Sequence, residues 1–208
     1  MKQEETFWDK RSRQYDAAVT KRDANYINII DSTIALLSSK DVVLDFACAS
    51  GEYSLDLAPC VQRVHGIDLS TRMIELANKK ARERQIANAT FDSADVFDAS
   101  LNRGAYSAIV AFNILHLVND LPGVLARLHE LLKTDGVLIS LTPCLGEKSW
   151  LFRHMVGLAH KLGAVPSISS LTSSSLASLV AGNGFEITEN RTWNKKHRAQ
   201  WIVAHKLR

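Results

Sequence analysis

The chain has 208 residues, of which 46% are hydrophobic and 23% are charged, and its formal net charge at pH 7 is +3. This length favours one sizeable hydrophobic core over two, and the small, dispersed charge argues against a nucleic-acid-binding surface. The basic stretches NKKARER and WNKKHR are interpreted as solvated faces.

The predicted elements begin with helices in the first forty residues. From residue 42 onward, short β-branched runs alternate with longer segments whose apolar residues recur every three or four positions. The predicted strands are 42–47, 63–68, 89–94, 106–113 and 136–142. The clearest predicted helices are 70–85 and 121–136, and Gly136 is expected to stop the second. This alternation predicts a doubly wound α/β fold, a parallel sheet with helices on both faces.

The last part of the chain departs from this alternation. Residues 169–184 predict a helix with a Ser/Thr N-cap, and residues 185–193 and 199–206 predict two strands. The link between these strands is too short for a crossover helix, so we expect them to be antiparallel neighbours. We expect a single domain with four parts: a helical cap at 1–40, a cofactor-binding core at 41–145, a substrate-side insertion at 146–170, and a C-terminal helix with its strand pair at 171–208.

The turn after the first strand, in VVLDFACASGEYS, is the first candidate site. In an open parallel sheet, ligands bind beyond the carboxyl ends of the strands. Asp45 ends this strand, and small residues at Ala47, Ala49 and Gly51 allow a tight turn that a ligand can approach closely. The alternative is a plain tight turn with small residues for packing. A dinucleotide-binding turn is disfavoured because the third small residue comes one position early for G-x-G-x-x-G.

Two further acids end the next two strands. Asp68 follows the second strand, where a carboxylate can accept hydrogen bonds from ribose hydroxyls, and Asp95 follows the third, within reach of an adenine amino group. For either acid alone, a helix N-cap or a solvated loop carboxylate is the alternative. Three acids at successive strand ends favour a ligand site.

Several motifs in order carry a family resemblance. They are FWDKRSRQYD, VLDFACASG for VLDxGCGxG, HGIDLSTRMIELA for VxGxDxSxxMLxxA, DSADVF, FNILHLV, and LHELLKTDGVLIS for xxRxLKPGGxLxI. The chain resembles class I S-adenosylmethionine-dependent methyltransferases, in particular the ubiquinone/menaquinone-type and type 11/12 group. The resemblance implies a Rossmann-like, seven-stranded, mostly parallel sheet with an antiparallel last strand, and S-adenosylmethionine as cofactor with S-adenosylhomocysteine as product.

The resemblance also implies roles for individual residues. Asp45 and the turn would surround the methionine portion, Asp68 would hold the ribose, and Asp95 with Val96 would flank the adenine. Tyr15 would cap the cofactor's carboxylate; fixing the N-terminal helix to the core is an equal alternative. Asn113 would lie beside the sulfonium. The full set of expected cofactor-binding residues is Tyr15, Asp45, Ala47, Cys48, Ala49, Gly51, Asp68, Leu69, Met73, Asp95, Val96 and Asn113.

The chain departs from the family pattern at its glycines. Ala47 and Ala49 replace two glycines of the first turn, and Thr134-Asp135 replaces Pro-Gly in the late turn. The two alanines in the first turn are expected to lower cofactor affinity, because alanine adopts positive φ less readily than glycine. A non-catalytic protein of the same fold that binds S-adenosylmethionine or S-adenosylhomocysteine is therefore the alternative to an enzyme.

An enzyme of this class needs little acid/base machinery. A sulfonium carries a good leaving group, so in-line alignment in a water-poor pocket suffices. His116 is the candidate base for a hydroxyl acceptor, and a histidine hydrogen-bonded at the rim is the alternative. In the insertion, Trp150, Phe152, Met155 and Leu158 would line an apolar acceptor pocket or cover the sheet edge.

No metal site is expected, because His154 and His160 fall on different helical faces, and Cys48, Cys60 and Cys144 lack CxxC spacing. The expected partner is a small, partly apolar acceptor, with no nucleic acid and no stable membrane insertion, since the run AIVAFNILHLV is too short to span a bilayer. Reduced cysteines and the lack of a secretory signal predict a cytoplasmic protein. The oligomeric state is left open.

Overall fold

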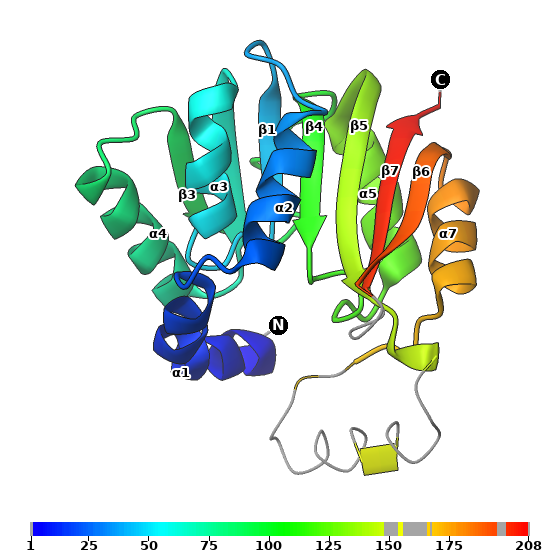
Figure 1. Ribbon diagram of the computed structural model, residues 1–208, viewed down its shortest axis with the longest axis horizontal. Helices are drawn as coiled ribbons and strands as arrows, with labels where there is room; N and C mark the ends of the chain where they lie inside the picture. Colours follow the sequence, from blue (N-terminus) through cyan, green and yellow to red (C-terminus); the bar gives the residue numbers. More distant parts are fainter. Residues whose placement is uncertain (1, 148–153, 156–165, 167, 195–198, 208) are drawn as a thin grey trace. The chain divides into compact units, whose positions relative to one another are not determined.

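The computed structural model describes residues 2–147, 154–155, 166, 168–194 and 199–207. Its strands form a seven-stranded sheet in the order β3-β2-β1-β4-β5-β7-β6. The elements, in chain order, are α1 (Lys2–Val19), α2 (Ala24–Ile34), β1 (Val42–Phe46), α3 (Glu52–Leu57), β2 (Arg63–Asp68), α4 (Thr71–Glu83), β3 (Ala89–Ser93), β4 (Tyr106–Phe112), α5 (Leu121–Leu131), β5 (Leu132–Pro143), α7 (Ser173–Gly182), β6 (Phe185–Asn194) and β7 (Ala199–Lys206), with short 3₁₀ helices at Ala58–Cys60 and Leu145–Glu147 (Figure 1). The predicted α/β class is confirmed.

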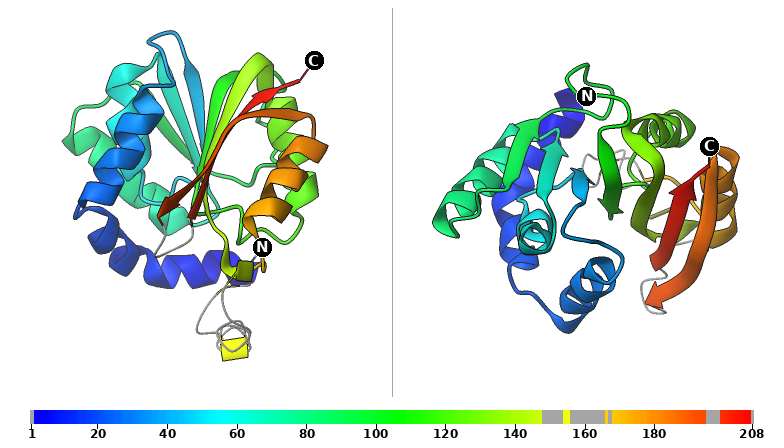
Figure 2. Two further views of the ribbon diagram at one scale, coloured as in Figure 1. Left: turned by 45° about the vertical axis from the view of Figure 1, so that its right-hand side comes forward. Right: turned by 90° about the horizontal axis from the view of Figure 1, so that it is seen from above.

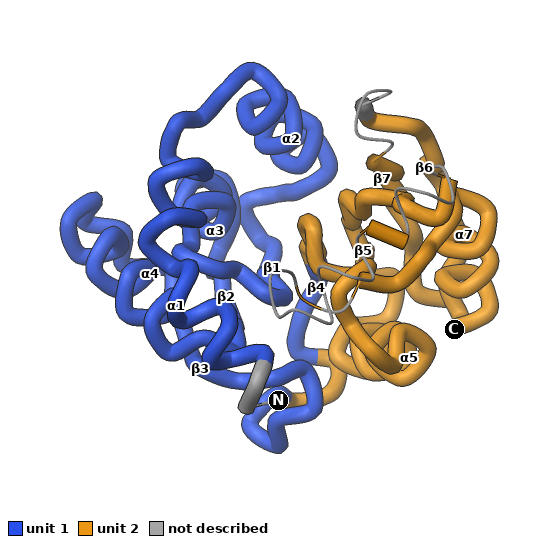
Figure 3. Tube along the Cα trace, turned by 90° about the horizontal axis from the view of Figure 1, so that it is seen from below, with its two compact units in different colours: residues 1–101, 105–109 blue, residues 102–104, 110–208 orange. Residues whose placement is uncertain are grey.

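The chain divides into two compact units. The first contains residues 1–101 and 105–109, and the second contains residues 102–104 and 110–208 (Figure 3). The boundary falls within β4.

The first unit contains the parallel strands β1, β2 and β3. All five residues of β1 are buried, as expected of a strand that is covered on both faces. Asp45 of β1 pairs with Gly66 of β2, and Asp68 at the end of β2 pairs with Ser93 of β3. The acids at the ends of β1 and β2 therefore lie at the same edge of the sheet.

Helix α4 follows β2 directly and starts at a side-chain cap. The Ser70 hydroxyl accepts a hydrogen bond from the Met73 amide, which satisfies one of the free amides of the first turn. Its buried residues, at helical spacing, are Met73, Ile74, Ala77 and Ala81. Helix α1 packs against α4, as can be followed in Figures 1 and 2.

The second unit confirms the prediction for the C-terminal strands. β7 pairs antiparallel with both β5 and β6. The preceding helix α7 packs against β6 and starts with a capping box, in which Thr172 accepts from the Ser175 amide and Ser175 bonds back to Thr172. The mixed, mostly parallel sheet with antiparallel last strands agrees with the predicted Rossmann-like arrangement.

The prediction for the late helix was wrong at its end. Helix α5 stops at Leu131, and Leu132 is already extended, with φ −70° and ψ 141°. Residues Leu132–Pro143 form β5, so Gly136 lies within the strand and does not stop the helix. The left-handed residue is Asp135, with φ 62°. Leu131 and Leu132 are both fully buried, the first at the end of the helix and the second at the start of the strand, so their apolar character does not mark where the helix ends.

Most of the expected insertion lies outside the described residues. Trp150, Phe152, Leu158 and His160 are not described, while the side chain of Met155 is 64% exposed. Of the helices that are described, none has both the length and the hydropathy to span a bilayer.

Candidate functional site

The turn after β1 keeps the backbone of a glycine turn although it contains alanines. Ala47, Ala49 and Gly51 have φ values of 60°, 49° and 75°. A left-handed conformation costs an L-residue about 1–2 kcal/mol, so surrounding contacts must hold the two alanines there. Two backbone hydrogen bonds do so: the Cys48 amide donates to the Ile67 carbonyl at 2.9 Å, and the Gly51 amide donates to the Cys48 carbonyl at 3.0 Å.

Gly51 is required for two reasons. Its φ is positive, and a Cβ at this position would come within 2.9 Å of Ala77 Cβ and of the Phe91 ring. The turn therefore lies directly against α4 and β3, and any larger residue would push it outward.

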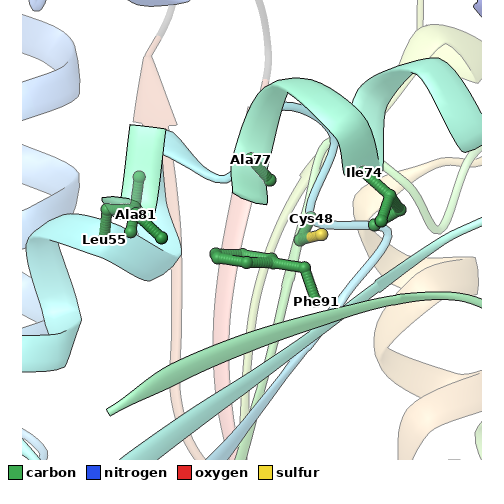
Figure 4. Packing of buried hydrophobic residues seen from close by; sticks show 6 residues of the cluster. All are labelled: Cys48, Leu55, Ile74, Ala77, Ala81 and Phe91. Carbon is green, nitrogen blue, oxygen red and sulfur yellow. The ribbon is translucent and has the colours of Figure 1, made fainter. Parts of the chain in front are cut away.

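The side chain of Cys48 points away from the turn. Its sulfur lies in a buried cluster with Phe91 and side chains of α3 and α4, as Figure 4 shows. Burial raises the pKa of the thiol well above its ordinary value, so the group remains protonated. If Cys48 contacts a ligand, it does so through its backbone.

Asp45 is a buried carboxyl at the base of the turn. It is 3% exposed, and its Oδ2 accepts a hydrogen bond of 2.5 Å from the Ser54 hydroxyl. Burial raises the pKa of Asp45 to about 7, although bonds from Ser54 lower it. A nearby cation would restore the charge of this carboxylate.

Asp68 connects the turn to the start of α4. Its Oδ2 accepts from the Ala49 amide at 2.9 Å, and its Oδ1 accepts from the Ser70 amide at 2.8 Å. Burial raises the pKa of Asp68, and these two bonds oppose that effect. Each carboxylate oxygen can accept a second hydrogen bond, so the side chain can still receive ligand hydroxyls.

Tyr15 of α1 lies near the same acids. Burial, together with the charges of Asp68 and Asp45, raises the pKa of Tyr15 to about 12. Its ring also meets Trp8 edge-on at 6.2 Å. The position near the turn is compatible with a ligand contact, and the Trp8 contact is compatible with fixing α1, so both roles considered for Tyr15 stay predictions.

The other expected cofactor residues of this unit differ in exposure. Leu69 and Asp95 are half-buried, while Val96 and Met73 are 2% and 1% exposed. Asp95 Oδ1 accepts from the Phe97 amide at 2.7 Å, an arrangement that orders this loop. The buried Met73 belongs to the apolar face of α4.

Asn113 and His116 belong to the second unit. Asn113 has φ 57°, a conformation that asparagine tolerates, and its amide donates to the Leu141 carbonyl at 2.7 Å. His116 is 8% exposed, and burial lowers its pKa to about 4, so the ring is neutral at physiological pH. Its Nδ1 has no hydrogen-bond partner among the described residues, and its carbonyl accepts from the Ser169 amide at 2.8 Å.

A buried charge network behind the turn was missed from the sequence. The Glu52 side chain is 1% exposed, and Arg84 Nη2 lies 2.6 and 2.8 Å from its two oxygens. Lys80 Nζ lies 2.7 Å from Glu52 Oε1, and Arg22 also contacts Glu52, at 3.3 Å. Burial would raise the pKa of Glu52, but the bonds from Arg84 and Lys80 lower it to about 2.

The interpretation of NKKARER as a solvated face was therefore wrong for two of its residues. Lys80 and Arg84 are 12% and 29% exposed, whereas Lys79 is 65% exposed. The i, i+4 spacing of Lys80 and Arg84 puts them on one face of the chain around α4, and this spacing was the available signal. Their acidic partner, Glu52, lies 32 residues before Arg84 in the sequence, and no sequence pattern links it to them.

Comparison with known proteins identifies the family. The sequence profile described as methyltransferase domain matches residues 37–204, so the chain belongs to the methyltransferase domain family. It is 32% identical over 110 residues to a ubiquinone/menaquinone biosynthesis C-methyltransferase, UbiE, of Citrifermentans bemidjiense, covering 50% of this chain and 46% of that protein. It is 31% identical over 136 residues to a malonyl-[acyl-carrier protein] O-methyltransferase of Acetivibrio thermocellus, covering 63% and 46%. The matches thus span less than half of these relatives.

Solved structures share the fold. One is a geranyl diphosphate C-methyltransferase from Streptomyces coelicolor in complex with Mg²⁺, geranyl diphosphate and S-adenosyl-L-homocysteine, with a TM-score of 0.68, 15% identity, and coverage of 85% of this chain and 79% of that one. At this identity the likeness shows the fold alone.

Proposed function

We propose that the chain is an S-adenosylmethionine-dependent methyltransferase that acts on a small, partly apolar molecule by in-line methyl transfer. The observation that carries this proposal is the turn after β1. At all three positions where this chain replaces a glycine of the family pattern, Ala47, Ala49 and Asp135, the backbone keeps a left-handed φ. These are backbone conformations that a glycine of the family pattern would adopt at little cost, and Ala47 and Ala49 hold them in the turn after β1.

The groups around the turn fit an adenosyl amino acid with a positive charge. The cofactor supplies an electrophilic methyl group on a sulfonium. Asp68 offers oxygens for the ribose hydroxyls, and Asp45 offers a buried carboxylate for the cationic methionine portion. Tyr15 is proposed to cover this portion from α1. Asp95 and Val96 are proposed to flank the adenine, with Leu69 and Met73 on the apolar side.

The remaining roles belong to the second unit. Asn113 is proposed to lie beside the reacting sulfur. His116 is neutral at pH 7, which leaves a ring nitrogen able to accept a proton from a hydroxyl acceptor. A pKa of about 4 makes it a weak base, so its contribution would be modest. Alignment and exclusion of water supply most of the rate acceleration in such a reaction. The small-molecule acceptor is proposed by analogy with the name of the ubiquinone/menaquinone biosynthesis relative.

Calorimetric titration tests the cofactor claim. Wild type should bind both S-adenosylmethionine and S-adenosylhomocysteine. Asp68→Asn should weaken binding by about ten- to a hundredfold, since a hydrogen bond to a charged group contributes about 1.5–3 kcal/mol. Asp92→Asn is the matched control: Asp92 lies on β3, is 68% exposed and pairs with His65, so cofactor affinity should not change. Lack of binding by wild type would refute the proposal.

Turnover separates an enzyme from a non-catalytic protein that binds the same cofactor. Purified chain is incubated with S-adenosylmethionine and a panel of small apolar phenols, amines and quinols, and S-adenosylhomocysteine is quantified. Formation that depends on one acceptor supports the enzyme. Tight cofactor binding without product across the panel would favour the binding protein.

A further inference from the structure

Helix α1 makes several polar contacts with the rest of its unit. Among its described side chains, residues 4–19, Ser12 alone is buried. Apolar burial therefore contributes less to the docking of α1 than it does for α4, whose apolar face is buried. The hydrogen bonds and ion pairs of α1 become correspondingly important for its position.

The first polar attachment centres on Lys80 of α4. Its ammonium pairs with Asp16 of α1, and it also donates to the carbonyl and the hydroxyl of Ser50, at 3.3 and 3.1 Å. Ser50 stands between Ala49 and Gly51 in the turn, and Asp16 follows Tyr15. The Lys80 ammonium, on a side chain that is 12% exposed, thus joins the candidate cofactor turn to the helix that carries Tyr15.

The second attachment lies beside the proposed ribose acid. Asp9 Oδ1 accepts from the Ser70 hydroxyl at 2.6 Å and from the Arg72 amide at 3.2 Å. The Ser70 amide in turn donates to Asp68. Helix α1 is therefore linked at two points to residues that touch the candidate site.

We infer that Lys80 is a positioning residue, which holds α1 and its Tyr15 against the Ala47–Gly51 turn and so couples docking of α1 to cofactor binding. This inference rests on the proposed function. Because Lys80 contacts both α1 and the Ala47–Gly51 turn, docking of α1 should favour cofactor binding at the turn. Cofactor binding must then favour docking of α1 by the same free energy. Lys80 itself is not expected to touch the reacting atoms.

The experiment compares cofactor affinity among variants that separate the attachment from the fold. Asp16→Ala removes the contact to α1 and leaves Lys80 its bonds to Ser50 and Glu52. Lys80→Met removes the whole bridge, while Glu52 keeps Arg84. Each should weaken S-adenosylhomocysteine binding about tenfold, which corresponds to about 1.4 kcal/mol. Lys79→Met, at an exposed neighbouring position, is the control and should bind like wild type.

Two readouts distinguish positioning from a general loss of structure. In a Tyr15→Ala background, Lys80→Met should have a much smaller effect on affinity, because the residue acts through α1. Hydrogen exchange of residues 9–19 should slow when S-adenosylhomocysteine binds wild type, and this protection should be lost in Asp16→Ala. Lys80→Arg should restore part of the affinity.

The outcomes separate the inference from the proposed function. If wild type binds no cofactor, the proposed function fails. If wild type binds and Asp16→Ala and Lys80→Met bind equally well, or if the effects of Lys80→Met and Tyr15→Ala simply add, the positioning role is refuted.

Discussion

The substitution Glu52→Gln, which replaces one carboxylate oxygen by an amide NH2 group, should strongly destabilise the fold. Glu52 is buried and charged, and its pKa falls from the ordinary 4.5 to about 2 because Arg84 and Lys80 donate to it. At 1.36 kcal/mol per pKa unit, a difference of about 2.5 units corresponds to roughly 3 kcal/mol of stability at neutral pH. Breaking a buried ion pair by removing one partner costs a similar 3–5 kcal/mol or so.

The contribution of Glu52 to the free energy of unfolding should decrease at low pH. The folded pKa of Glu52 lies below its unfolded value, so its contribution is fully present above pH 4.5 and is lost as the pH falls toward about 2. Wild type and Glu52→Gln should therefore differ by a constant amount from pH 5 to 8. Below pH 4.5 the difference should shrink.

Urea unfolding followed by circular dichroism at pH 8, 7, 5 and 4 measures both features. The control is Glu83→Gln: Glu83 is 61% exposed, and its oxygen is 3.7 Å from Lys79 Nζ. That exposed pair should contribute less than about 0.5 kcal/mol. The reasoning is refuted if Glu52→Gln loses no more stability than Glu83→Gln, or if its deficit stays unchanged at pH 4.

Three further predictions concern the candidate site and its surroundings. Ala49→Gly, at φ 49°, should keep or slightly raise the unfolding free energy, whereas Ala177→Gly, inside helix α7, should lose about 0.5–1 kcal/mol; thermal unfolding of both variants checks this, and equal losses would contradict it. Asp45 has a folded pKa raised to about 7, so its contribution to stability is present below pH 3.8 and is lost as the pH rises through 7. Binding of the cationic cofactor should then release a proton near pH 7, which titration in buffers of different ionisation enthalpy would detect, and Asp45→Asn should abolish this release. The folded pKa of His116 is lowered to about 4, so its contribution is present above pH 6.5 and is lost as the pH falls through 4; unfolding curves of His116→Leu should lack that dependence, and an unchanged curve would argue against it.

The sequence predicted helices and strands well where the local residue pattern is compatible with only one type of element. The strand expected at 63–68 is β2, residue for residue, and Val64, Gly66 and Ile67 are its buried positions. The end of α5 was mispredicted because leucines at 131 and 132 suit a helix and a buried strand equally. The tertiary structure determines that α5 ends at Leu131 and that β5 begins at Leu132.

The candidate site was predictable where a motif fixes the backbone and unpredictable where distant charges meet. The acids at 45 and 68 follow from strand ends in a parallel sheet. Alanine's steric preference argued against positive φ at 47 and 49, yet the contacts of the turn outweigh a cost of about 1–2 kcal/mol each. The pairing of Glu52 with Arg84 spans 32 residues and depends on how α3 and α4 lie beside the turn, which no local pattern records.

The most direct test follows backbone amide resonances while S-adenosylhomocysteine is added to the ¹⁵N-labelled chain. A cofactor held at the turn should shift the amides of Ala47, Ala49 and Gly51 and those around Asp68 most strongly, in a saturable manner. Saturable binding that shifts amides elsewhere and leaves these unmoved would contradict the assignment of the site, and no shift at all at millimolar ligand would contradict the function.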